Sequence, residues 1–134
     1  MDQTLSLKIK EFGEALKRLK ESLDQAKNEF IRDSIIKRFE FAFELGWKTA
    51  KTYLRQKQGV NIFSPKECWR ELRKNDLLSV EETEIFLAMT DERNSIVHTY
   101  DQNFFEVLSE KIKVDYYFRL DNLFKILEKN AGEN

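Results

Sequence analysis

Apolar residues recur along the first part of the chain with the spacing of an α-helix. They are separated by four, three, four, three and four positions, and they are Leu5, Ile9, Phe12, Leu16, Leu19 and Leu23. On a helix with about 3.6 residues per turn, this spacing puts them all on one face and leaves charged side chains on the others. The chain is therefore predicted to begin with an amphipathic helix over residues 3–25.

A second helical pattern, over residues 29–57, is apolar around a wider arc. Its central positions are Ile31, Ile35, Phe39, Ala42, Phe43, Trp47, Ala50 and Leu54. A helix with so wide an apolar arc contacts more than one neighbour, so it is predicted to form the centre of the fold. Gly46 indicates a close approach of another helix, and Gly59 fits the left-handed position that follows a helix end.

Two serine-led motifs indicate further helix starts. Ser64–Glu67 and Ser79–Glu82 both place a serine three residues before a glutamate, which is the pattern of a capping box. The first predicts a short helix over residues 65–74, in which Cys68 is a small core residue. The second predicts a fourth helix with side chains spaced by three, four, four and three positions, which are Phe86, Met89, Arg93, Val97 and Tyr100.

A last apolar pattern predicts a helix over residues 103–129. The whole chain has only 4 Gly and 1 Pro, which is too little turn chemistry for a sheet of many strands. The fold class is therefore all-α. We expect an antiparallel, up-and-down four-helix bundle with an additional short helix, as one domain over residues 1–134.

The net charge and the composition limit the kinds of ligand that the chain can bind. The net charge is −1, from 23 basic and 24 acidic residues, so RNA could be bound only through a local basic patch. One His and one Cys leave little for a transition-metal site, and we expect no metal or other cofactor. The polar start Met1–Thr4 and the lack of a long apolar run predict a cytoplasmic protein without a membrane segment.

The residues best suited to chemistry lie in Asp91–Asp101, which holds the single histidine. On an ideal helix Arg93 and Tyr100 share a face, whereas Arg93 and His98 lie about 140° apart. The pair could converge if the helix ends near His98, or if two copies of the chain meet across a symmetric interface.

This set of side chains suits RNA cleavage or phosphoryl transfer. An imidazole, which titrates near pH 6.5, can take a proton from a ribose 2′-hydroxyl, and a guanidinium can stabilise the charge on phosphate in the transition state. Arg93 and His98 are the candidate catalytic residues, and Asn94 could orient His98 or the phosphate. Structural roles also fit, because a histidine near a helix end is commonly a cap and Tyr100 could be a buried ring with its hydroxyl in water.

Two stretches resemble a known family. Arg93–Tyr100 resembles the Arg-x4-His-x-Tyr motif of HEPN domains, with Asn94 matching the polar residue that follows the arginine. Phe39–Lys48 resembles the second-helix segment of one HEPN branch, the nucleotidyltransferase substrate-binding proteins, whose members are encoded beside a minimal nucleotidyltransferase. The similarity extends from about residue 5 to about residue 128.

The resemblance implies more than the spacing does. It implies a helical-bundle homodimer with the motif in a cleft at the dimer interface, and a metal-independent endoribonuclease that acts as the toxin of a two-gene toxin–antitoxin module. Arg93 and His98 would be the catalytic pair, supported by Asn94. In related modules the partner nucleotidyltransferase transfers nucleotides from ATP onto the motif tyrosine, here Tyr100, and silences the toxin.

Two functional hypotheses follow. The chain is either the ribonuclease toxin of such a pair, or a binding subunit that presents a substrate to the nucleotidyltransferase. The alternative to both is a helical dimer that binds a nucleotide or a protein and has no ribonuclease activity.

Overall fold

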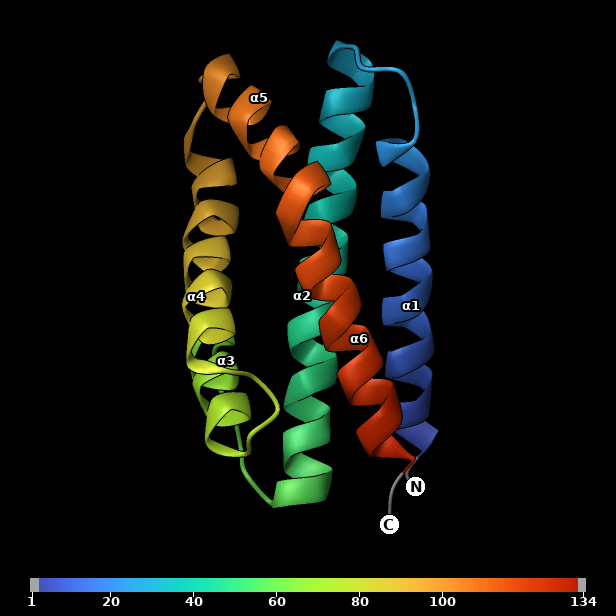
Figure 1. Ribbon diagram of the computed structural model, residues 1–134, viewed down its shortest axis with the longest axis vertical. Helices are drawn as coiled ribbons and strands as arrows, with labels where there is room; N and C mark the ends of the chain where they lie inside the picture. Colours follow the sequence, from blue (N-terminus) through green and yellow to red (C-terminus); the bar gives the residue numbers. More distant parts are fainter. Residues whose placement is uncertain (1–2, 133–134) are drawn as a thin grey trace.

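The computed structural model describes residues 3–132. Met1 and Asp2, the start of the polar N-terminus, lie outside this range. The described chain is all-helical, and Figure 1 shows long helices that alternate in direction, with the two ends of the chain together at one end of the bundle. The predicted all-α, up-and-down bundle with a short extra helix is confirmed.

The helical elements follow the predicted order. They are α1 (Gln3–Leu23), α2 (Glu29–Gln58), α3 (Pro65–Lys74), α4 (Val80–Ser95), a 3-10 turn (Ile96–His98), α5 (Gln102–Lys111), a π-helical turn (Ile112–Tyr116) and α6 (Tyr117–Ala131). α5, the π turn and α6 form one bent rod that crosses α2 (Figure 1). The short α3 packs beside α4, on the other side of α2 from α1 (Figure 1).

The central position of α2 is confirmed, because α2 packs against α1, α3, α5 and α6. The close approach predicted at Gly46 is also confirmed, since a Cβ there would lie 3.0 Å from the Phe12 ring of α1. The core next to α3 is aromatic, and the Trp69 indole N–H donates to Thr90 of α4 over 2.8 Å. Cys68 is fully buried, as predicted, and burial raises the pKa of its thiol.

The helix ends follow the local sequence signals. Ser79 and Glu82 form the predicted reciprocal capping box at the start of α4. Ser64 caps α3 with Pro65 in its first turn, but the Glu67 carboxylate accepts the N–H of Phe63 rather than that of Ser64. Only the serine half of the predicted capping box is therefore present, because the glutamate binds the backbone N–H one residue before Ser64. Gly59 ends α2 in the left-handed region, with φ of 69°.

The C-terminal helix differs from the prediction of one regular helix over residues 103–129. The π turn inserts one extra residue into a helical turn, so that Lys111 and Tyr116 point to the same neighbour on α4. Lys111 Nζ lies 3.0 Å from Glu92 Oε1, and the Tyr116 hydroxyl donates to the same oxygen over 2.6 Å. A regular α-helix brings residues three or four apart together, whereas these two are five apart.

The end of α4 also differs from the prediction. The apolar spacing extends the helix through Val97 to Tyr100, but α4 ends at Ser95. The Ser95 hydroxyl donates to the Asp91 carbonyl, and Thr99 takes up an extended conformation. Val97 and Tyr100 are 73% and 96% exposed, so they contribute nothing to the core, and the reading of Tyr100 as a buried ring is wrong.

Candidate functional site

Arg93, in the last turn of α4, is held against α2. Its guanidinium lies 5.2 Å from the centre of the Phe43 ring, and Nη2 donates to Oε2 of Glu44 over 2.5 Å. Nη1 donates to the Asn94 side chain over 3.2 Å. An arginine has five N–H donors, and among the described residues Arg93 uses two of them. The other donors are available to a phosphate group, whose oxygens match the planar fork.

Glu44 is the residue of α2 that orients Arg93. Its carboxylate also accepts the indole N–H of Trp47 over 3.1 Å and lies 3.0 Å from Lys48 Nζ. Partial burial opposes ionisation of this carboxyl, but the hydrogen bonds from Lys48 and Trp47 and the charge of Arg93 outweigh burial and lower the pKa of Glu44. Glu44 is thus an anion near neutral pH, and it fixes the direction in which Arg93 points.

His98 occupies a different environment. It is the last residue of the 3-10 turn that follows α4, and its side chain is exposed. Within residues 3–132 the imidazole makes no hydrogen bond or ion pair. In this part of the chain the ring is therefore neither a helix cap nor part of a polar network, and its exposed position makes it accessible to solvent or to a ligand.

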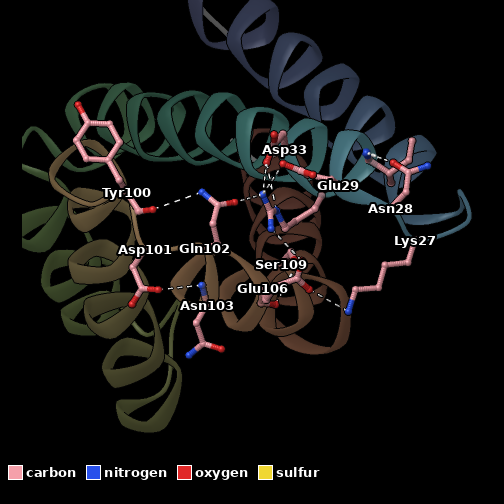
Figure 2. Close-up of polar contacts among 12 residues, drawn as sticks. Lys27, Asn28, Glu29, Asp33, Tyr100, Asp101, Gln102, Asn103, Glu106 and Ser109 are labelled. Atoms are coloured by element: carbon pink, nitrogen blue, oxygen red, sulfur yellow. Dashed lines mark hydrogen bonds and ion pairs between the residues drawn. The ribbon is translucent and has the colours of Figure 1, made fainter.

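Tyr100 lies in the extended link between the 3-10 turn and α5. Its backbone is fixed by turn chemistry, because the Asp101 N–H donates to the Thr99 hydroxyl and the Asp101 carboxylate caps α5 by accepting from Asn103. Figure 2 shows the Tyr100 ring directed away from these contacts. The phenol is therefore presented to solvent from a backbone held on both sides.

The link is also tied to the start of α2 by a buried arginine. Arg32 is only 6% exposed, and its guanidinium donates to Gln102, Asp33 and Glu106. The Gln102 amide in turn donates to the Tyr100 carbonyl over 3.4 Å. A buried charge is stable only when it is paired in this way, so Arg32 sets the position of the segment that carries Tyr100.

The predicted site residues thus fall into two groups. Asn94 is hydrogen-bonded to Arg93, whereas His98 and Tyr100 project from the exposed segment that follows. Within the described chain no hydrogen bond joins Arg93 to His98. The helix does end near His98, as one of the two alternatives for convergence requires, but this does not join the two side chains by a hydrogen bond among the described residues.

Sequence reasoning assigned no role to three residues that shape the site. Glu44 lies inside the Phe39–Lys48 segment that carries the family resemblance, so the segment could have suggested it. Arg32 stands at a core-facing position of α2, and a charged residue in an apolar stripe is a usable signal for a buried ion pair. Glu92, which joins α4 to the π turn, has no comparable signal.

Two further findings concern cofactors and membranes. Among residues 3–132, no three His, Cys, Asp or Glu side chains are grouped so that they could hold a metal ion. None of the helices described combines the length and the apolar content that a membrane span needs.

Comparisons with solved structures agree on the fold. A Thermus thermophilus protein is 34% identical, with a TM-score of 0.81 over 87% of this chain and 98% of that one. The tri-AMPylated Shewanella oneidensis HEPN toxin, solved in complex with MNT antitoxin, is 18% identical, with a TM-score of 0.78 over 96% of this chain and 99% of that one. A mutant of the toxin–antitoxin pair MntA–HpeT gives the same TM-score and coverage at 17% identity. No curated protein matches the chain at a significant level.

The fold and the motif define an all-helical bundle with an Arg-x4-His-x-Tyr segment that runs from the last turn of α4 into the link before α5. The family model that describes nucleotidyltransferase substrate binding protein like chains matches residues 7–129. The chain belongs to this family, and the predicted family is confirmed.

Proposed function

We propose that this chain is the HEPN component of a two-gene toxin–antitoxin pair, the partner of a minimal nucleotidyltransferase, and that it is a metal-independent endoribonuclease. Its catalytic pair is Arg93 and His98, and a homodimer completes the site. Family membership and the fold shared with a HEPN toxin that was solved with its MNT antitoxin support the pairing.

The observation that carries the ribonuclease proposal is the contrast between Arg93 and His98. The guanidinium of Arg93 is oriented by Phe43 and Glu44 and keeps unused donors. The imidazole of His98 has no partner within residues 3–132. The ring makes no contribution to the described fold that these contacts reveal, and it is accessible to a substrate.

The reaction that fits these groups is transesterification of RNA. His98 takes the proton of a ribose 2′-hydroxyl, and the oxygen attacks the adjacent phosphorus. The bond from phosphorus to the 5′-oxygen breaks, and that oxygen takes a proton from solvent. The products are a 2′,3′-cyclic phosphate and a 5′-hydroxyl. Arg93 stabilises the additional negative charge on the phosphoryl oxygens, and Asn94 supports Arg93.

Tyr100 is the proposed site of nucleotidylation by the partner. The phenolic oxygen attacks the α-phosphorus of ATP, the bond to the β-phosphate oxygen breaks, pyrophosphate leaves and the phenolic proton passes to solvent. The 96% exposure of Tyr100 gives an enzyme access to the hydroxyl. The tri-AMPylated state of the Shewanella oneidensis HEPN toxin supports this type of modification.

The proposed homodimer is supported by the outward face of α2. One stripe on this face of the helix contains Asp33, Lys37, Phe41, Glu44 and Lys48. In an antiparallel, two-fold pairing centred next to Phe41, Asp33 meets Lys48 and Lys37 meets Glu44, so each of these two pairs brings opposite charges together. Because Glu44 also holds Arg93, this pairing places Arg93 beside the second copy.

Cleavage of RNA by the purified protein in the presence of EDTA tests the ribonuclease activity. His98→Ala and Arg93→Ala are expected to reduce the rate by about 10²-fold or more while the helical circular dichroism is unchanged. Cleavage by both variants at the wild-type rate would remove this site from the mechanism. Complete absence of cleavage by the unmodified wild-type protein would favour the alternative of a non-catalytic binding dimer.

The dimer is tested by light scattering of two matched variants. Phe41→Asp places a charge on the proposed interface, and it is expected to yield monomers. Leu7→Asp, on α1, is the control, because Leu7 is 57% exposed and Phe41 is 60% exposed. Dimers of Phe41→Asp would exclude this face of α2 as the interface.

A further inference from the structure

The basic residues of the chain are unevenly distributed. Residues 55–74 contain six basic and two acidic residues, a net charge of +4, so the remainder of the chain carries −5. This is the local excess of positive charge that RNA binding requires in a protein of net charge −1. The excess lies on the last turn of α2 and on α3.

The basic side chains of α3 lie on one face. Four basic residues fall within about 100° of arc around the helix, and they are Lys66, Arg70, Arg73 and Lys74. The buried face of the helix lies outside this arc and contains Cys68, Trp69 and Leu72. Arg70, Arg73 and Lys74 are exposed and make no ion pair with another described residue, and the same is true of Arg55 in the last turn of α2. Unpaired surface cations in a row form a suitable surface for a polyanion.

The two acidic residues of α3 do not interrupt this face. Glu67 and Glu71 lie together on another flank of the helix, and both have partners inside the chain. Glu67 accepts the backbone N–H of Phe63, and Glu71 accepts from the Asn75 side-chain amide. Their charge is therefore directed to the helix ends.

An exposed aromatic ring immediately precedes α3 in the chain. Phe63, in the link immediately before α3, is 80% exposed, although burial would stabilise a side chain of this size. Proteins that bind single-stranded nucleic acid combine a basic track for the backbone with exposed aromatic rings on which bases stack. Phe63 and the α3 cations together have this composition.

The basic face also adjoins the proposed catalytic site. Lys66 Nζ lies 2.6 Å from a carboxylate oxygen of Asp91, which is two residues before Arg93 on α4. The first turn of α3 is thus attached to the turn of α4 that carries Arg93. From there the basic residues continue along α3 for about 12 Å, at about 1.5 Å per residue.

We propose that Arg55, Phe63, Lys66, Arg70, Arg73 and Lys74 form a binding surface for single-stranded RNA, which leads the strand to Arg93. This inference rests on the proposed ribonuclease function, and it assigns substrate binding to residues outside the Arg-x4-His motif. Phe63 stacks on a base, and the cations bind successive phosphates.

The surface is tested in the full-length His98→Ala protein, so that binding is measured without cleavage. The probe is a fluorescein-labelled single-stranded oligouridine, and its Kd is measured from 50 to 200 mM KCl. In this background Arg70→Ala with Arg73→Ala is expected to reduce the slope of log K against log salt by about 1.4, which is about 0.7 for each lost phosphate contact in a single strand. Phe63→Ala is expected to weaken binding about fivefold or more with an unchanged slope.

The matched control is Lys17→Ala with Arg18→Ala, two exposed cations of α1 on the other side of α2 from α3. An effect on RNA affinity equal to that of the α3 variant would overturn the proposal, because it would mean that net charge alone governs binding. Unchanged RNA affinity in the α3 variant would also overturn it, and a simultaneous loss of nucleotidyltransferase binding would assign the surface to the protein partner.

The outcomes separate this proposal from the proposed function. A wild-type protein that does not cleave RNA, but binds it through α3, would contradict the catalytic proposal and leave the surface in place. Cleavage that depends on His98 but is indifferent to Arg70, Arg73 and Phe63 would leave the catalytic proposal in place and exclude the surface.

Discussion

The two halves of the Arg-x4-His-x-Tyr motif differ in how firmly the fold holds them. Arg93 stands on a long helix and is fixed by a ring and a carboxylate of α2. His98 and Tyr100, only a few residues later, project into solvent from a short turn and a link. The fold thus orients the residue that we propose binds phosphate, and it leaves exposed the residues that we propose exchange a proton and receive a nucleotide.

The difference shows which proposed roles require a side chain that is held in place and which require one that is accessible. Electrostatic stabilisation of a transition state depends on donors that are oriented before the reaction, as Glu44 and Phe43 orient Arg93. A residue that must be reached by a second protein, as we propose for Tyr100, needs access instead. For His98, we propose that a second copy of the chain or the substrate completes the surroundings of the imidazole.

The largest effects are expected for Arg93→Ala and His98→Ala, which should lower the cleavage rate similarly but differ in their effect on stability. Arg93→Ala and His98→Ala are both expected to lower cleavage by about 10²-fold or more. Arg93→Ala should also cost about 1–2 kcal/mol of unfolding free energy, because it removes an ion pair and a cation–π contact. His98→Ala should change that free energy by less than about 0.5 kcal/mol, as is usual at an exposed position. Urea unfolding of both variants measures this, and equal destabilisation would remove the distinction between the two halves.

A second contrast is between a buried arginine of α2 and an exposed arginine of α1. Arg32→Ala removes hydrogen bonds to three acceptors from a buried position, and it is expected to cost about 2–3 kcal/mol of unfolding free energy. Arg18→Ala, an exposed arginine of α1, is the matched control and should change the free energy by less than about 0.5 kcal/mol. Similar values for both would show that the Arg32 network does not hold the Tyr100 segment.

A smaller effect is expected in the pH dependence of stability. The pKa of Glu44 is lowered from its ordinary value of 4.5 in the folded protein. The ionised Glu44 therefore stabilises the folded protein fully above pH 4.5. This stabilisation is lost as the pH falls below 4.5 and through the lower pKa that Glu44 has in the folded protein. The Glu44→Gln variant lacks this carboxylate, so its unfolding free energy should fall less than that of the wild type between pH 6 and pH 3, by at most about 1 kcal/mol. Thermal unfolding of both proteins between pH 6 and pH 3 gives the comparison, and identical curves would mean that Glu44 does not carry the charge that orients Arg93.

The smallest expected change is in Tyr100→Phe. The ring is almost fully exposed, so removal of its hydroxyl should alter the unfolding free energy by less than about 0.5 kcal/mol and leave cleavage intact. The variant should, however, gain no mass when incubated with the partner nucleotidyltransferase and ATP. A modified Tyr100→Phe protein would place the acceptor elsewhere.

Much of the fold follows from local patterns. The apolar stripes, the serine caps and Gly59 act within a few residues of one another, so the sequence predicts α1, α2, α3 and the start of α4. The motif residues can be named for the same reason, since the family resemblance is itself a local pattern.

The parts that differ from the prediction depend on contacts between distant segments. Arg93 bonds Glu44 across 49 positions, and Arg32 bonds Glu106 across 74, which no periodicity reveals. The π turn exists where Lys111 and Tyr116 both reach Glu92, so its cause lies on another helix. At the end of α4, the turn chemistry of Ser95, Thr99 and Asp101 overrides an apolar spacing that would extend the helix.

The central claim is that Asp91–Asp101 forms half of a site and that a second copy supplies the rest. It is tested by mixing inactive Arg93→Ala protein with inactive His98→Ala protein under conditions that exchange subunits. If each site takes its arginine from one copy and its histidine from the other, every mixed dimer regains one intact site, and an equal mixture should reach roughly a quarter of wild-type cleavage. No recovery, with mixed dimers shown to be present by native mass spectrometry, would contradict the account.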